Sequence, residues 1–437
     1  MSQGLIIGVV VLYFVLFLVL GQHVATVLFA SGLLGIALWV GPQVFDGIIG
    51  TNVFFTASTY SLSIIPLYLL MAQMLLRGGV VVDLFRVGHR LAGHRRFPLG
   101  LATVVSGGLL GAVSGSGAAT SAALATLAAP QLEQIGYTRR MSVAIAAVAG
   151  SLSAIIPPSL IMIIYGSLTS VSIGHLFMGA LLPAGLCIGV YIACLGLFGE
   201  VKPGVVAGPV GNAVGDDGDG AAGSLPAFVF VVVLMVVVFG GIYGGVVTAG
   251  EAGALGAFTA LIGMIVMGRV DVRGIGMALT DSVRVTAMIM LIVIGSQIFG
   301  RFLSYSRLPH ELLALLEPLL ANPTLVVALL LGAFFVFGLF LESAAVMVLL
   351  IPVMMPILEA TEVDLLWFGV MASFMISLGL LTPPVGLAAY AASTAAGHPV
   401  GPVFRMTSVF ALSAAVVVSA AMLWFPAMVT WLPSTLR

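Results

Sequence analysis

Long apolar segments recur through nearly the whole chain. Ten of them have 16 residues or more. At about 1.5 Å per residue, helices of this length approach the roughly 30 Å of a bilayer's hydrocarbon core. Of 437 residues, 61% are hydrophobic and only 7% are charged, so the sequence predicts an all-α polytopic membrane protein. The ten expected spans are 5–20, 24–40, 58–76, 141–166, 174–198, 226–244, 250–267, 284–303, 366–391 and 404–427.

Two further apolar regions, 99–133 and 324–358, are each interrupted at the centre. The first is cut by Ser114-Gly115-Ser116-Gly117, and the second by Gly338 together with Glu342-Ser343. Each half has about 13–16 residues, which is too short to cross the bilayer. We therefore expect each region to form a re-entrant helical hairpin that enters and leaves on the same side.

The chain is similar to itself at one constant offset of 226 residues. Pro157-Pro158 corresponds to Pro383-Pro384, because 157 + 226 = 383. Ser116-Gly117 corresponds to Glu342-Ser343, so the centres of both hairpins coincide as well. Self-similarity at a fixed period indicates repeated structural units. The first repeat is expected at 1–198 and the second at 226–437.

Each repeat is predicted to contain five transmembrane helices plus one hairpin. Five is odd, so the second repeat must be inverted relative to the first. The Lys and Arg residues test this prediction independently. Only Arg301, Arg307 and Arg437 fall on one side, which leaves 15 − 3 = 12 for the other. The richer side is predicted to be cytoplasmic, with both termini outside.

An amphipathic stretch precedes each hairpin, and we expect it to form a helix along the membrane interface. Between the repeats, 199–225 is rich in Gly, Pro and Asp and is expected to be a cytoplasmic linker. Its acidic run lacks the ligand spacing of a calcium loop, so a solvated tether is the preferred interpretation. The apolar positions of the two amphipathic stretches are Val80, Leu84, Val87 and Leu91, and Leu308, Leu312, Leu315 and Leu319.

The hairpin centres and the Pro-Pro pairs are candidate binding elements. Non-helical backbone at membrane depth must be buried in protein or line a cavity. A proline also frees a carbonyl about one turn earlier in its helix. Free carbonyls and hydroxyls would form an uncharged oxygen cage suited to Na⁺, while the next helices, near Ala118 and Ala344, point positive ends at an anion. The carbonyls are those of Ser153, Ala154, Gly379 and Leu380, and the hydroxyls those of Ser114, Ser116, Ser343 and Thr382.

Each candidate also has a purely structural explanation. The Ser-Gly-Ser-Gly turn suits a hinge with a helix cap, and proline kinks are common in membrane helices. Glu342 is the only acid well inside an apolar segment, where it either binds a ligand or caps the following helix. Two Pro-Pro pairs at the repeat offset, each facing a hairpin, favour the functional interpretation.

Several other functions are disfavoured. A net charge of −1 offers no basic surface for nucleic acid, and Cys187 and Cys194 are expected to pack inside one span. The spans contain no Ser–His, paired-Asp or His-Glu-x-x-His set, which argues against an intramembrane enzyme. Hairpins that open from opposite sides suit alternating access better than a channel.

Taken over nearly its whole length, the sequence resembles the large membrane subunit of tripartite ATP-independent periplasmic (TRAP) transporters. The resemblance rests on GLLGAVSGSGAATSAALATLAAPQLEQIGY (108–137), SAIIPPSLIMIIYGSLTSVSIGHLFMGALLPA (153–184), ESAAVMVLLIPVMMPI (342–357) and FGVMASFMISLGLLTPPVGLAAYAAS (368–393). It implies a sodium-driven symporter of the bacterial inner membrane with an elevator mechanism. It also implies a separate small membrane subunit, a soluble periplasmic substrate-binding protein and a small carboxylate solute.

The same resemblance implies roles for individual residues. Many relatives carry Asp shortly after the first hairpin centre and Asn after the second proline pair, where this chain has Thr120 and Ala388. This departure bears on the class of solute. A standalone sodium/anion symporter that needs no binding protein is the alternative. The implied sodium-binding residues are Ser114, Ser116, Ser153, Gly338, Glu342, Ser343, Gly379 and Thr382, and the implied substrate-binding residues are Ser116, Gly117, Thr120, Pro157, Ser343, Thr382 and Pro383.

Overall fold

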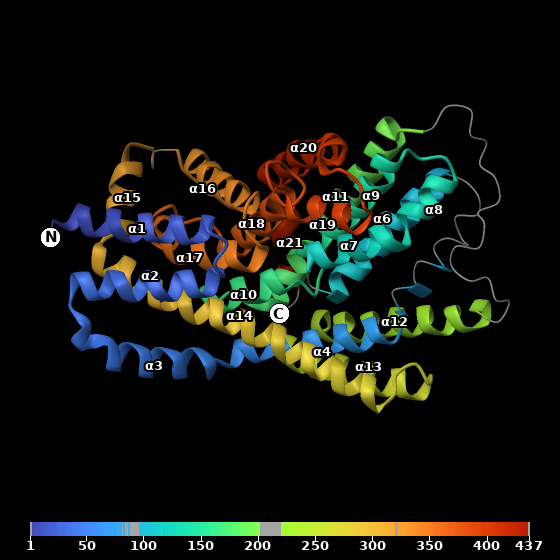
Figure 1. Cartoon of the computed structure of the whole chain (residues 1–437), viewed down its shortest axis with the longest axis horizontal. Helices are drawn as coiled ribbons and strands as arrows, with labels where there is room; N and C mark the ends of the chain where they lie inside the picture. The colour runs from blue at the N-terminus through green and yellow to red at the C-terminus, as the bar shows by residue number, and fades with distance from the viewer. Residues whose placement is uncertain are drawn as a thin grey trace.

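The computed structural model describes residues 2–80, 82–83, 86–87, 96–114, 116–201, 220–319 and 322–435, and within them every regular element is a helix (Figure 1). The first half contains α1 (Gln3–Val19), α2 (Val24–Trp39), α3 (Phe45–Ala57), α4 (Ile64–Arg77), α6 (Arg96–Ser114), α7 (Gly117–Leu127), α8 (Ala129–Gln134), α9 (Arg139–Ser151), α10 (Leu160–Thr169) and α11 (Ile173–Phe198). The second half contains α12 (Gly220–Tyr243), α13 (Ala249–Val266), α14 (Val272–Ser306), α15 (Leu308–Leu316), α16 (Pro323–Gly338), α17 (Ser343–Ala360), α18 (Leu365–Gly379), α19 (Leu387–Ala395), α20 (Val400–Trp424) and α21 (Ala427–Thr435).

Helix boundaries in the two halves lie close to 226 residues apart. α7 begins at Gly117 and α17 at Ser343, and α9 begins at Arg139 and α18 at Leu365. Both differences are 226. In each half, a hairpin arm, a broken helix and a long helix follow one another in the same order.

Seven helices in the described part of the chain are long and apolar enough to cross a membrane. Six coincide with expected spans, and the seventh is the hairpin arm α17. This arm has 18 residues, more than expected for half a hairpin, and it continues through Pro352 and Pro356. Membrane helices tolerate internal prolines where neighbouring helices satisfy the freed backbone groups.

Several helix boundaries differ from the expected ones. α12 begins at Gly220, inside the expected linker 199–225, and α21 was not expected. α3 (Phe45–Ala57) was not expected, and α14 starts at Val272 instead of 284 and runs for 35 residues. At the 226-residue offset, α3 and α4 together correspond to α14, which is one unbroken helix. The first half breaks at a Ser- and Thr-rich stretch, where the hydroxyls of Ser58 and Thr59 both donate to the carbonyl oxygen of Phe55. Such local hydrogen bonds compete with helix continuation.

Close backbone contacts join helices of the two halves. α2 packs on α14, and α13 packs on α4 (Figure 1). A Cβ atom at Gly32 would lie 2.8 Å from the backbone nitrogen of Phe299, and one at Gly295 would lie 2.8 Å from the carbonyl oxygen of Ala25. Small residues of this kind let membrane helices approach closely.

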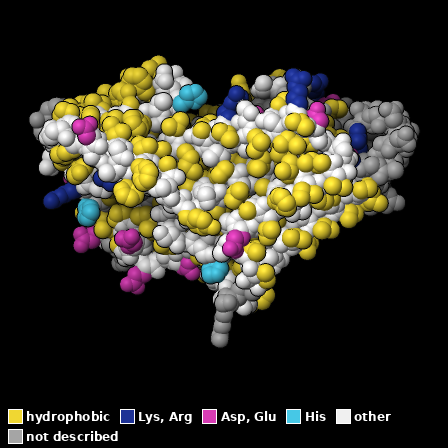
Figure 2. Space-filling model, turned by 90° about the horizontal axis from the view of Figure 1, so that it is seen from below, with side chains coloured by type: hydrophobic (Ala, Val, Ile, Leu, Met, Phe, Trp, Pro, Cys, Tyr) yellow, Lys and Arg dark blue, Asp and Glu magenta, His cyan; other side chains and the backbone are white. Residues whose placement is uncertain are grey.

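The outer surface is strongly apolar. Figure 2 shows hydrophobic side chains spread over much of one face. Val19 at the end of α1 is 78% exposed and Val266 at the end of α13 is 79% exposed. Contiguous apolar surface of this extent is typical of a protein whose outer face is covered by lipid or by other membrane subunits.

The two expected interfacial stretches are described to different extents. The second forms α15, followed by a 3-10 turn at Glu317–Leu319. In the first, Val80 and Val87 are buried, whereas Leu84 and Leu91 lie outside the described residues. Most of the expected linker, 202–219, also lies outside them.

Candidate functional site

Each Pro-Pro pair interrupts a helix. α9 ends at Ser151, and the chain resumes as α10 at Leu160 after Pro157-Pro158. α18 ends at Gly379, and α19 begins at Leu387 after Pro383-Pro384. Proline lacks a backbone donor and disfavours a helical conformation at the residue before it, so two in succession end the helix. Both Pro-Pro peptide bonds are cis.

The prediction that the carbonyls before these breaks are unpaired is wrong for three of the four. The Ala154 oxygen accepts a hydrogen bond from Ser159 Oγ at 2.8 Å. The Gly379 oxygen accepts from the backbone nitrogen of Thr382 at 3.1 Å, and the Leu380 oxygen from that of Ala388 at 3.0 Å. Ser159 and Ala388 supply their donors from beyond the proline pairs, and Thr382 supplies its donor just before Pro383. A carbonyl oxygen has two lone pairs, so one such bond leaves capacity for a cation.

The first hairpin centre lies against both breaks. Ser116 caps α7 and accepts a hydrogen bond from the backbone of Ala119 at 3.5 Å. Gly117 is buried, and a Cβ atom there would lie 3.2 Å from Ser153 Oγ and 3.1 Å from Leu380 Cδ1. The structure therefore places Gly117 next to Ser153 and next to Leu380 of the second half. The side chain of Ser114 lies outside the described residues, as does Gly115.

Behind this centre, α7 packs tightly on α9. Thr120 and Pro157 are both buried. Ser121 Oγ donates to the carbonyl oxygen of Ala147 at 3.1 Å, which links the hairpin arm to the first broken helix. Ser121 was not among the residues predicted from the sequence. Its position four residues after Gly117, one turn along the same helix face, is the signal that could have identified it.

At the second hairpin centre, Glu342 caps α17. Its Oε2 accepts a hydrogen bond from the backbone nitrogen of Ala344 at 2.9 Å, so the predicted capping role is confirmed. Ser343 is buried, whereas Glu342 is exposed. The carboxylate therefore already offsets the positive end of α17, unlike the uncharged cap of α7.

The second centre is also tied to the second break. The backbone nitrogen of Gly386 donates to the Leu339 oxygen at 3.1 Å. Gly338 and Gly379 lie in a close helix contact, where a Cβ atom at Gly379 would be 2.8 Å from the Cα of Gly338. Absence of a side chain at both positions is what permits this contact.

Thr382 and Pro383 lie next to this contact with different exposure. Thr382 is half-buried, and its Oγ1 donates to the Leu378 oxygen at 2.8 Å. Pro383 is exposed. The first proline pair is buried and the second is exposed, so the two breaks differ in their access to the surroundings.

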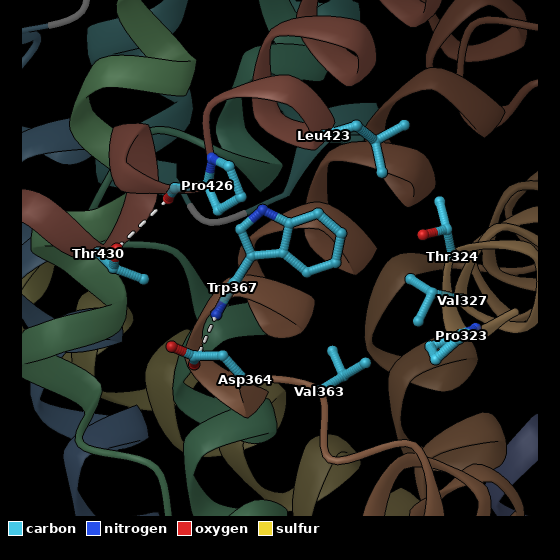
Figure 3. Close-up of a pocket in the computed structure, with 9 residues that line it drawn as sticks. All are labelled: Pro323, Thr324, Val327, Val363, Asp364, Trp367, Leu423, Pro426 and Thr430. Atoms are coloured by element: carbon cyan, nitrogen blue, oxygen red, sulfur yellow. Dashed lines mark hydrogen bonds between the residues drawn. The ribbon is translucent and has the colours of Figure 1, made fainter.

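A separate cavity of about 370 Å³ lies between α16, α18 and the end of α20 (Figure 3). Figure 3 shows the Trp367 indole among the lining side chains, and its Nε1 donates to the Met422 oxygen at 3.0 Å. Asp364 caps α18 through the backbone nitrogen of Leu366 at 2.7 Å. None of the predicted site residues lines this cavity.

A second, more polar cavity of about 560 Å³ lies where the α10–α11 and α12–α13 connections meet the start of α4. Its lining includes Tyr60, Ser170, His175 and Thr248. These residues come from connections that were predicted from the sequence to lie on one side of the membrane. The predicted site residues do not line this cavity either.

Comparison with known families identifies the family to which this chain is similar. Residues 11–428 match the family model described as the tripartite ATP-independent periplasmic transporter, DctM component. The chain is 30% identical over 371 residues to a putative TRAP transporter large permease protein of Haemophilus influenzae, covering 84% of this chain and 85% of the relative. It is 29% identical over 379 residues to the C4-dicarboxylate TRAP transporter large permease protein DctM of Pseudomonas aeruginosa, covering 86% of each.

The fold is also similar to that of a solved structure. The crystal structure of the Alcanivorax borkumensis YdaH transporter has a TM-score of 0.63 at 15% identity and covers 88% of each chain. At that identity the likeness concerns the fold alone. The sequence relatives are transporter permeases and not enzymes. Because the family match spans both hairpins and both broken helices, this chain belongs to the large permease subunits of the TRAP transporters.

Proposed function

We propose that the chain is the large subunit of a sodium-coupled symporter that imports a small carboxylate solute by an elevator motion. A soluble periplasmic binding protein delivers the solute, and a separate small membrane subunit completes the transporter. The observation that carries the proposal is the meeting of two hairpin centres with two broken helices. Gly117 lies against Ser153 and Leu380, and Leu339 is hydrogen bonded to Gly386.

Helices of each half pack on helices of the other half in a reciprocal way, which supports an inverted repeat. α7 packs on α19, and α17 packs on α10. The two hairpin arms are equivalent at the 226-residue offset, and so are the two helices after the breaks. Reciprocal contacts of this kind are what an approximate two-fold axis produces. Such an axis lying in the membrane plane is the common architecture of secondary transporters.

The division into a moving and a fixed part follows from the packing. α1–α4 and α12–α14 pack mainly on one another, with α3, α4, α12, α13 and α14 along the lower side of Figure 1. The hairpins and broken helices, from α6 to α10 and from α16 to α19, form the other group. We assign the first group to the scaffold and the second to the transport domain.

The caps of the two hairpins suggest that the solute binds at one hairpin centre and the cation at the other. Ser116 is uncharged, so its cap adds no negative charge at the positive end of α7, and we assign the solute carboxylate to that end. Glu342 adds a negative charge at the start of α17, which favours Na⁺. Both ligands would order the same pair of centres, so each would raise the affinity for the other.

The solute class and orientation are parts of the same proposal. The Pseudomonas aeruginosa relative is named for C4-dicarboxylates. We assign a solute contact to Thr120, which is buried in the arm that follows the first centre. The distribution of Lys and Arg supports a bacterial inner-membrane location with both termini periplasmic.

Uptake into proteoliposomes tests the proposal. The chain is reconstituted with its small subunit and binding protein under an imposed sodium gradient. Ser116→Ala and Thr382→Ala are each expected to lower sodium-dependent uptake about tenfold, which corresponds to about 1.4 kcal/mol of ligand interaction. Thr126→Ala is the control, because that hydroxyl is exposed on α7 and donates to Ala123 within the helix. Wild-type uptake at an unchanged rate without a sodium gradient would refute sodium coupling.

The same preparation distinguishes a standalone symporter. Omission of the binding protein is expected to abolish uptake. Full uptake by the chain alone would support the standalone sodium/anion symporter instead.

A further inference from the structure

One hydrogen bond joins equivalent positions of the two halves. Ser377 Oγ in α18 donates to the carbonyl oxygen of Ser151 at 2.8 Å. The two residues are 226 apart, since 151 + 226 = 377, and both are fully buried. The bond therefore lies close to the approximate axis that relates the two repeats.

Its position is just before both breaks. Ser151 is the last residue of α9, and the backbone nitrogen of Ile155 bonds to the Leu152 oxygen, three residues earlier, instead of to the Ser151 oxygen as an α-helix would require. The predicted ligand Ser153 follows Ser151 by two residues. Gly379 follows Ser377 by two residues as well. A shift of either broken helix along its axis would change this bond.

We propose that Ser377 is a positioning residue that couples the two half-sites of the transporter. The inference rests on the proposed sodium-coupled function. When a cation orders the backbone near Ser153, the Ser377 hydroxyl transmits that geometry to α18 and to the backbone near Gly379. Ion binding in one repeat thereby raises affinity in the other.

The first hairpin centre completes this link. Gly117 lies against Ser153 of its own repeat and Leu380 of the other. A change in the relative position of α9 and α18 therefore reaches the capped start of α7, where we place the solute carboxylate. The Ser377 bond, two residues from the predicted ligands in each repeat, connects both breaks with that centre.

α18 offers a matched control. Ser373 is one turn earlier, equally buried, and donates to the Gly369 oxygen of its own helix at 2.9 Å. Ser373→Ala and Ser377→Ala each remove one hydroxyl oxygen from the same helix, and both side chains are fully buried. Only the second removes a bond between the repeats.

The experiment measures sodium dependence of uptake in proteoliposomes containing the full chain, its small subunit and its binding protein. The wild type is expected to give a Hill coefficient near 2, as two coupled sites allow. Ser377→Ala is expected to lower the coefficient toward 1 and to raise the half-saturating sodium concentration about fivefold, the factor for one hydrogen bond of about 1 kcal/mol. Ser373→Ala is expected to keep the wild-type coefficient.

Ser377→Cys keeps the volume but has only a weak donor, so it reports on coupling if the alanine variant does not fold. It is expected to lose cooperativity while its thermal unfolding stays close to that of wild type. A wild-type Hill coefficient in correctly folded Ser377→Ala or Ser377→Cys would overturn this inference and leave the proposed function intact. Equal loss of cooperativity in Ser373→Ala would overturn it too. Sodium-independent uptake by the wild type would instead overturn the proposed function.

Discussion

At the scale of single residues, Glu342 was given two alternative roles from the sequence, ligand binding and capping of the next helix. Its carboxylate caps α17 through the nitrogen of Ala344, yet the side chain is exposed at a hairpin centre. A carboxylate has acceptor capacity for more than one partner, so accepting the bond from Ala344 does not exclude contact with a cation. The structure therefore makes the two roles compatible.

Two substitutions separate these roles. Glu342→Gln keeps an acceptor for the cap but removes the charge, so thermal unfolding should stay near that of the wild type while sodium affinity falls. Glu342→Ala also loses the cap, which should cost about 1 kcal/mol of stability. Thermal unfolding in detergent and sodium-dependent uptake measure the two effects. Unchanged sodium affinity in Glu342→Gln would leave Glu342 with the capping role only.

At the scale of secondary-structure elements, the connection from α4 to α6 is fastened to the scaffold at its start. Asp83 is 1% exposed and pairs with Arg269, between α13 and α14, at 2.5 Å, and with Arg86 at 3.4 Å. Arg269 also donates to the Gly78 oxygen at 3.4 Å. This connection leads to the first hairpin. Its anchored start therefore provides a fixed point for the motion that we propose.

Asp83→Asn is expected to weaken this anchor by about 1.5–3 kcal/mol, the usual worth of a hydrogen bond to a charged group. We expect slower sodium-driven uptake at equal expression. Asp281→Asn is the control, because the Arg77–Asp281 pair joins α4 and α14 within the scaffold and both side chains are partly exposed. Equal effects of the two variants on uptake would contradict a special role for the anchor.

Element boundaries were predictable where local chemistry determines them. The Pro-Pro breaks and the hairpin centres were found because proline, glycine and helix-capping residues act on their own backbone. The separation of α3 from α4 was missed. Apolar composition alone does not reveal that serine and threonine hydroxyls interrupt one copy, whereas the equivalent part of α14 continues unbroken.

At the scale of the whole molecule, helices of one half pack on helices of the other half. This packing brings the hairpins and broken helices of the two halves together. The same reciprocal packing that joins the hairpin arms to the opposite half also joins α2 to α14 and α13 to α4. If the repeats are inverted as proposed, both chain ends lie on the periplasmic side.

Cysteine accessibility tests this orientation. In a Cys187→Ala/Cys194→Ala background, Gln3→Cys and Ser434→Cys should both react with a membrane-impermeant maleimide added to intact cells. Arg139→Cys, at the start of α9, should react only after the membrane is permeabilised. The native cysteines are buried, so their removal should change labelling little. Labelling of the two ends from opposite sides would contradict the inverted arrangement.

The sequence by itself determined the membrane class, the 226-residue period, the two broken helices and the residue types at the hairpin centres. Hydropathy, proline chemistry and helix capping act within a few residues, so a linear pattern contains them. Only the tertiary structure decided that Ala154, Gly379 and Leu380 carbonyls regain partners, that Gly338 meets Gly379, and that Ser377 bonds to Ser151. The three carbonyl pairings depend on the path that the backbone takes around each break, with donors three to eight residues away. The last two contacts depend on how helices up to 226 residues apart are packed, and a linear pattern specifies neither.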